Sequence, residues 1–196
     1  MNVLGALAAP FVRAYCAPRA QRFAAALDDP ARSQRDALAR IVRSTAMTGY
    51  GRSLGLLATD DCDAFRGKVP VVDFAAIAEW IERQRGGEAA ALAPGRTRVY
   101  EPTSGSAGAI KRIPYNDALL AAFRSLFAIW AHDLLTNVLR PRSGCTFMSV
   151  SPPLAGREGF TDDREYLGGP LRVLVGRFIV TPPSILDAVA FRDALA

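Results

Sequence analysis

The sequence has few of the residues that build metal sites and disulfide frameworks. It contains one histidine, His132, and three widely spaced cysteines, Cys16, Cys62 and Cys145. This set is too small for a zinc site, and an odd number of cysteines without a CxxC pair is typical of a reducing compartment. We therefore expect no metal ligands in the chain and a cytoplasmic location. No serine, histidine and aspartate form a recognisable triad, so we reject hydrolase chemistry.

Long apolar runs and clustered charge are also missing. The most apolar stretch, 119–135, is interrupted by Arg124, His132 and Asp133. No segment reaches the roughly 18 uninterrupted apolar residues of a membrane-spanning helix. The net charge of +5 comes from scattered arginines, without the basic face and interleaved aromatic residues of a nucleic-acid interface. We therefore expect neither a membrane nor a nucleic acid as a partner.

Apolar periodicity and helix-breaking residues predict a helical first half. A first helix should end before Pro30, and a second should stop near Gly49 and Gly51, where two glycines would permit a tight exit. Asp73 is placed to cap a further helix, because its carboxylate can accept hydrogen bonds from the first turn. Residues 1–95 are thus predicted to be mainly helical.

The second half is predicted to alternate strands with helices. The expected elements are a strand at 96–101, a long helix at about 116–138, strands at 145–150 and 171–180, and a helix from Ser184. Such alternation favours an α/β layer with a mostly parallel sheet and flanking helices. Residues 96–196 would form this portion, and 1–196 a single domain.

The segment Thr103–Lys111, TSGSAGAIK, is the strongest candidate for a site. Small residues let backbone N–H groups converge on an anion, and a lysine at the end supplies a full positive charge. The segment carries three hydroxyl groups and two glycines, from Thr103, Ser104, Ser106, Gly105 and Gly108. Its spacing is not that of a Walker A loop. These residues alone leave two interpretations open, a phosphate-binding loop and a flexible surface turn.

The TSGSAGAIK segment resembles the signature loop of the acyl-adenylate-forming superfamily, and its context resembles the auxin-responsive acyl-acid amido synthetase family. The matching landmarks, in chain order, are Thr48-Gly-Tyr-Gly51, Asp63-Ala-Phe-Arg66, Val69-Pro-Val-Val-Asp-Phe74, Glu101-Pro-Thr-Ser-Gly-Ser106, Lys111-Arg-Ile-Pro-Tyr115, Ser149-Val-Ser-Pro152 and Asp162-Asp-Arg-Glu-Tyr-Leu167. Each is short, but their order and spacing run through most of the chain. Two features depart from the superfamily loop, Ala107 in place of a hydroxyl residue and Ala109-Ile110 before the lysine.

The resemblance implies an ATP-dependent ligase. It would activate a carboxylic acid as an acyl-adenylate and transfer the acyl group to an amine, typically of an amino acid. The loop would bind the phosphates of ATP together with Mg²⁺. The contacts would come from Thr103, Ser104, Ser106 and Lys111, and Gly105 and Gly108 would allow the phosphates to approach closely. Lys111 would also act in catalysis. The implied fold is the N-terminal part of an adenylate-forming large domain. A C-terminal portion would be missing, so we expect the chain alone to be inactive.

Two other functions stay open at this point. One is a catalytically incompetent truncated remnant or interaction module, and the other is an acyl-CoA-type ligase of the same superfamily. The acyl substrate and the choice between amine and thiol acceptor cannot be read from these residues. His132 is interpreted as a packed or surface residue, and Trp80 and Trp130 as core. Tyr115 could pack against the loop or the substrate, or form part of a helix entrance with Pro114. The acidic group Asp162, Asp163 and Glu165 is interpreted as a solvated loop.

Overall fold

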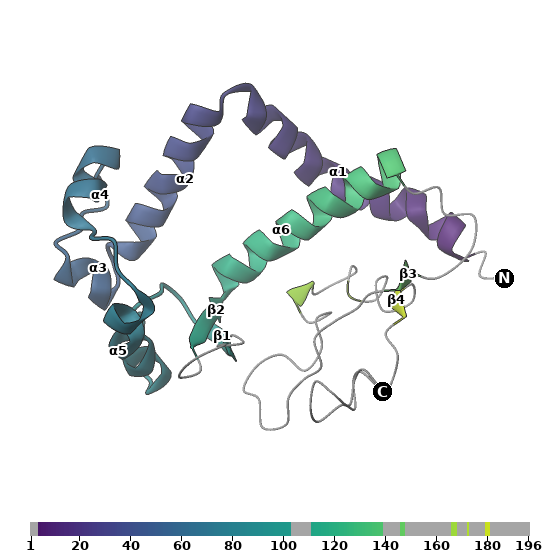
Figure 1. Ribbon diagram of the computed structural model, residues 1–196. Helices are drawn as coiled ribbons and strands as arrows, with labels where there is room; N and C mark the ends of the chain where they lie inside the picture. Colours follow the sequence, from purple (N-terminus) through teal and green to yellow (C-terminus); the bar gives the residue numbers. More distant parts are fainter. Residues whose placement is uncertain are drawn as a thin grey trace. The chain divides into compact units, whose positions relative to one another are not determined.

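The structure is a computed structural model that describes residues 4–102, 111–138, 146–147, 166–167, 172 and 179–180 (Figure 1). Its helices are α1 (Leu4–Asp28), α2 (Pro30–Thr45), α3 (Gly49–Ser53), α4 (Cys62–Lys68), α5 (Phe74–Arg85) and α6 (Asp117–Asp133), which continues into a π-helical turn, η1 (Leu134–Val138). Its strands are β1 (Thr97–Pro102), β2 (Arg112–Asn116), β3 (Thr146–Phe147) and β4 (Ile179–Val180). The chain divides into two compact units, a central unit, Ala25–Ala118, and a terminal unit that combines Met1–Ala24 with Leu119–Ala196.

The helices begin and end close to the residues that predicted their limits. The carboxylate of Asp29 accepts a hydrogen bond from the Arg32 backbone N–H at 2.9 Å, and α2 begins at the following residue, Pro30. Asp73 caps α5 in the same way, since its Oδ1 accepts from the backbone N–H of Ala76 at 3.1 Å. These side chains satisfy N–H groups that have no partner within the first helical turn. The predicted break before Pro30 and the predicted cap at Asp73 are confirmed.

The core of the terminal unit lies between α1 and α6. Cys16, Ala128, Ala131 and Leu167 are buried together there. The prediction that Trp130 belongs to the core is wrong, because this side chain is 48% exposed. Apolar residues at helical spacing do mark a face of α6, but that face is wider than the contact it makes with the other described residues.

The helical stretch that contains α6 is more apolar along its length than the sequence analysis expected of any segment. Within the described residues, one helical stretch, 117–138, is long and apolar enough to cross a membrane by length and composition. Its middle carries Arg124, whose Nε donates a hydrogen bond to the backbone carbonyl of Tyr166 at 3.1 Å. The ring of Phe123 lies 5.0 Å from that of Tyr166. The face of α6 that carries Phe123 and Arg124 therefore packs against another part of the chain, at Tyr166.

The helical core of the central unit is formed by α2, α4 and the segment between them. Val42 and Ala46 of α2 are buried with Leu56, and Phe65 and Val69 pack against this cluster. Asp60 and Lys68 form an ion pair at 2.8 Å beside it, in which the carboxylate side chain is only 7% exposed. The pair connects the two ends of the segment that contains α4.

An antiparallel β-hairpin, β1–β2, completes the central unit. Val99 pairs with Tyr115, and Pro102 pairs with Arg112 at the end nearest the connecting loop. Tyr115, interpreted as part of the entrance to a helix at about 116–138, lies with Pro114 within β2, and α6 begins at Asp117 directly after this strand. A proline is compatible with this position because, among the described residues, the hairpin has two strands and each has one edge without a strand partner.

The mostly parallel sheet is not shown by the described residues. They form two separate two-stranded sheets, antiparallel β1–β2 and parallel β3–β4. The short strands β3 and β4 fall within the strands expected at 145–150 and 171–180. The helix expected from Ser184 lies outside the described part of the chain. What is visible is a helix-rich protein with a small antiparallel hairpin in its central unit.

Candidate functional site

The β1–β2 hairpin holds the two ends of the predicted phosphate loop next to each other. Pro102 and Arg112 are cross-strand partners, so the chain leaves β1 and returns to β2 at neighbouring positions. Most of the predicted contacts lie outside the described residues, namely Thr103, Ser104, Gly105, Ser106 and Gly108. The structure therefore describes the base on which the segment is mounted.

Lys111 is the residue of the predicted loop that the structure describes. Its side chain is exposed, and its Nζ lies 5.6 Å from the centroid of the Phe74 ring at the start of α5. Among the described residues, no carboxylate forms an ion pair or hydrogen bond with this ammonium group. A lysine held against an aromatic face and lacking a carboxylate partner there keeps its charge available for an anionic ligand.

The opposite end of the hairpin is fixed to α5 by Gln84. The Gln84 amide nitrogen donates to the Thr97 hydroxyl at 2.6 Å, and its oxygen accepts from the backbone N–H groups of Leu92 and Ala93 at 2.9 and 2.8 Å. The residue is 9% exposed. One buried amide thus connects α5, the segment after it and the first residue of β1.

The segment between α5 and β1 is also held from α3. The backbone N–H groups of Gly49 and Tyr50 donate to the carbonyls of Ala90 and Ala91 at 3.0 and 2.8 Å. A Cβ on Gly49 would lie 3.0 Å from the Trp80 ring and 3.2 Å from the Ala91 carbonyl oxygen. The glycine allows this close approach, in addition to any role at a helix end.

Gly51 likewise allows the backbone of α3 to approach the end of α2 closely. A Cβ there would collide with the Thr45 carbonyl, lying 2.7 Å from its carbon atom. Thr48 is fully buried, and its hydroxyl donates to the Thr45 carbonyl at 2.7 Å while accepting from the Gly51 N–H at 3.0 Å. The prediction of a tight helix exit was therefore incomplete, since both glycines permit contact between backbones. The motif is a structural junction.

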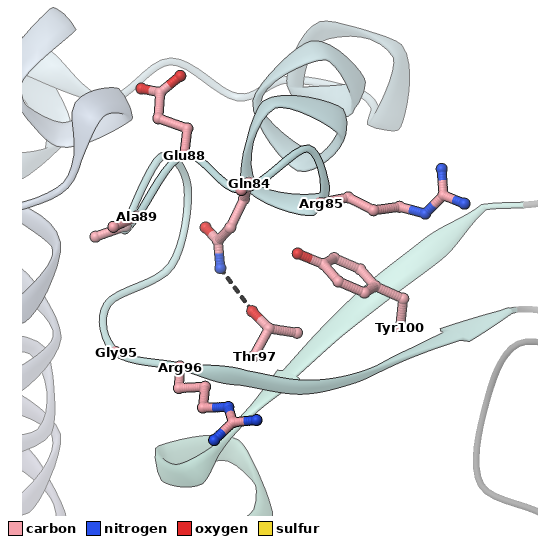
Figure 2. A pocket seen from close by; sticks show the side chains of 10 residues that line it. Gln84, Arg85, Glu88, Ala89, Gly95, Arg96, Thr97 and Tyr100 are labelled. Carbon is pink, nitrogen blue, oxygen red and sulfur yellow. Dashed lines mark hydrogen bonds between the residues drawn. The ribbon is translucent and has the colours of Figure 1, made fainter.

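A hollow of about 520 Å³ lies between the end of α5 and β1 (Figure 2). Figure 2 shows Gln84 reaching to Thr97 and the Tyr100 hydroxyl directed into the same space. The strand is irregular between Thr97 and Val99, which allows Thr97 and Tyr100 to face one side. Arg85 and Arg96 are also in the lining, which contains no histidine, cysteine or serine. The lining also includes the acidic residue Glu88, so the hollow offers both hydrogen-bond donors and acceptors.

Tyr115, on β2, is held in its neutral form. Burial raises the pKa of its phenol, and the negative charge of Glu101 raises it further. A phenol with a raised pKa stays protonated near neutral pH and does not act as a base there. Tyr115 can therefore pack or donate a hydrogen bond beside the hairpin, as the sequence analysis allowed, but from a strand.

The other candidate residues do not assemble into a second site within the described part of the chain. His132 lies half-buried near the end of α6. No group of three or more His, Cys, Asp or Glu residues that could hold a metal ion is found among the described residues. The acidic group at 162–165 and Cys145 lie outside them. Two residues of this region had no role predicted from the sequence. Gln84 is a lone glutamine on a helix, which no motif marks as functional. Phe74 lay inside one of the family landmarks but had no role assigned to it.

The sequence is similar to proteins of a known family. Residues 19–160 match the GH3 family N-terminal domain, a range that includes the whole hairpin and the predicted loop. Over 94 residues, 47% of the chain, the sequence is 35% identical to the probable indole-3-acetic acid-amido synthetase GH3.12 of Oryza sativa subsp. japonica. That match spans 15% of the length of the rice protein. The similarity is therefore to a limited part of a much longer relative.

Proposed function

Since this chain belongs to the GH3 family, we propose that its hairpin and Thr103–Lys111 loop bind the triphosphate of ATP for an acyl-acid amido synthetase. The family resemblance drawn from the loop and its landmarks is confirmed by the match over residues 19–160. The proposed enzyme is a ligase that joins a carboxylic acid to an amine through an acyl-adenylate. We further propose a cytoplasmic location.

The observation that supports ATP binding most strongly is the placement of Lys111. It lies at the end of a small-residue loop whose two ends are paired across the hairpin, and it is exposed without a carboxylate partner among the described residues. Phosphate groups need donors that approach closely and a cation that no acidic group neutralises. The loop composition and the lysine meet both needs.

In the proposed reaction the chain contributes binding and charge. The loop N–H groups and the hydroxyls of Ser104 and Ser106 would donate to phosphate oxygens, while Lys111 would stabilise negative charge as pyrophosphate separates from the α-phosphorus. Mg²⁺ is usually held mainly by substrate phosphates with one or two carboxylates, so it needs no dedicated cluster of acidic residues. Bound Mg²⁺ would supply further neutralisation of the phosphates.

ATP binding is tested by calorimetric titration of the chain with ATP and with inorganic tripolyphosphate. We expect both to bind, because the loop is proposed to contact the phosphates. Lys111→Ala should weaken binding by about tenfold, the scale of a charged contact. Arg66→Ala, which removes an equal charge from an exposed position on α4, is the matched control and should bind normally. Equal affinities of Lys111→Ala and the unaltered chain would contradict the role of the lysine.

The transfer step is tested in a chimera in which residues 19–160 replace the matching segment of the rice protein. The name of that relative makes indole-3-acetic acid the first carboxylate to supply, with an amino acid or coenzyme A as acceptor. We expect carboxylate-dependent pyrophosphate release and an amide product, both reduced about tenfold or more by Lys111→Ala. Pyrophosphate release that does not fall in Lys111→Ala would contradict the role of the lysine in this step.

A further inference from the structure

Helix α5 runs alongside the hairpin and contacts it near both ends. Phe74, its first residue, lies beside Lys111 at the loop end, while Gln84, near its last residue, bonds to Thr97 at the other end. The strand register agrees with this arrangement, because Thr97 pairs with Asn116 and Pro102 with Arg112. The helix is therefore in a position to influence the lysine through Phe74.

We propose that Phe74 is a positioning residue that holds the Lys111 ammonium group for an incoming polyphosphate. This inference rests on the proposed function and assigns to α5 a part in ligand binding. Phe74 acts through Lys111 and need not touch the ligand itself. The ammonium keeps its contact with the ring while its remaining N–H groups meet the phosphate oxygens.

An aromatic ring suits this task better than a carboxylate. The face of the ring attracts a cation electrostatically within about 6 Å, and the observed 5.6 Å separation lies within that range. An aspartate at the same place would pair with the ammonium and then repel the phosphate. The ring restricts a long, flexible side chain without neutralising it. Phe74 is half-buried, so its own position is fixed by its surroundings.

The proposal is tested by titrating variants of the chain with ATP. Phe74→Leu removes the π face while keeping an apolar side chain, and should weaken ATP binding by about twofold to fivefold, the scale of an exposed cation–π contact. Phe74→Tyr keeps the aromatic face and should bind like the unaltered chain. Phe65→Leu is the matched control, because Phe65 packs against the α2 cluster, and should leave ATP affinity unchanged.

A double variant separates positioning from a general structural effect. In the Lys111→Ala background, Phe74→Leu should cause no further loss of ATP affinity, because the ring then has no ammonium group to hold. An equal loss in both backgrounds would overturn the proposal. So would tighter binding by Phe74→Leu, since the ring would then compete with the ligand for the lysine.

A second measurement needs no ligand. The ε-methylene protons of Lys111 should show an upfield ring-current shift in the NMR spectrum of the unaltered chain, and Phe74→Leu should abolish it. Absence of this shift would overturn the inference while leaving the proposed function untouched. Failure of the unaltered chain to bind either ATP or tripolyphosphate would refute both, whereas loss of binding by Lys111→Ala but not by Phe74→Leu would refute this inference alone.

Discussion

The two ends of the hairpin are held by different kinds of contact. At the end where β1 begins, a buried glutamine makes three hydrogen bonds of 2.6 to 2.9 Å, and the segment that it holds is also bonded to α3. At the loop end, the contact described for Lys111 is with one aromatic ring at 5.6 Å. The first arrangement fixes backbone in place, and the second leaves a charged side chain able to adjust.

This difference suits a protein that binds a highly charged ligand. Buried hydrogen-bond networks are costly to disturb, so they define where the strands lie. A cation–π contact at an exposed site is weak and leaves the N–H groups of the ammonium unpaired, so the ammonium can meet a ligand while it stays beside the ring. We therefore expect substitutions near Gln84 to change stability and substitutions near Lys111 to change ligand binding. The following experiments test whether the two kinds of effect are separate.

The largest stability effect is expected from Gly51→Ala. The added Cβ would collide with the Thr45 carbonyl, and neither backbone segment can move without disturbing the buried Thr48. We predict a loss of about 3 kcal/mol in the free energy of unfolding, the upper range for overpacking. Urea denaturation followed by circular dichroism would measure it.

Gly67→Ala is the matched control for this substitution. Gly67 lies within α4, and a Cβ there would meet no atom within 4 Å. Alanine favours a helix over glycine by about 0.5–1 kcal/mol, so this variant should be as stable as the unaltered chain or slightly more so. Similar stabilities of the two glycine variants would show that the junction between α2 and α3 is looser than described.

A smaller loss of stability is expected from Gln84→Leu. The variant keeps the size of the side chain but leaves two backbone N–H groups and the Thr97 hydroxyl without their partner. We predict a loss of about 2 kcal/mol in unfolding free energy, measured by the same urea titration. Gln84→Glu can still accept from Leu92 and Ala93, and Thr97 can then act as donor, so it should retain more stability. A neutral effect of Gln84→Leu would remove the contrast between the two ends.

The smallest effect concerns Asp60, outside the hairpin. The backbone N–H of Leu57 and the ammonium of Lys68 both lower the pKa of this carboxyl group. A lowered folded-state pKa stabilises the protein above the unfolded value near 3.9, and that stabilisation is lost as the pH falls through the folded value. The melting-temperature advantage of the unaltered chain over Asp60→Asn should therefore shrink between pH 6 and about pH 3. A constant difference across this range would contradict the assigned cause.

The parts of the fold that the sequence predicted were those set by local chemistry. Asp73 was recognisable as a helix cap because a carboxylate satisfies the first N–H groups of a helix wherever the helix packs. Pro30 was recognisable as the break between α1 and α2, whereas the cap formed by Asp29 is seen only in the structure. The small residues and terminal lysine of Thr103–Lys111 carry a similarly local electrostatic signal, and the phosphate-binding role that they predict stays a prediction. These signals are contained within a few consecutive residues.

The parts that were missed depend on residues distant in the chain. Gln84 is buried by the segment after α5 and by β1, which no periodic pattern on α5 reveals. Gly51 was recognised as a glycine that ends a helix, but its closeness to Thr45 requires the turn between α2 and α3 to be known. Pro114 and Tyr115 were interpreted as a helix entrance, but they belong to the strand that precedes α6, a pairing with β1 that the local sequence does not reveal.

The most direct test of the central claim is an ATP titration of the ¹⁵N-labelled chain observed by NMR. Binding of the triphosphate by Thr103–Lys111 predicts that amide chemical shifts change chiefly in that segment, led by Gly105 and Gly108, and that Lys111→Ala reduces these changes. The amides around Gln84 should move little, because that end of the hairpin is held by its buried network. Shifts concentrated around Arg85 and Arg96 in the hollow, with the loop amides unchanged, would contradict the account.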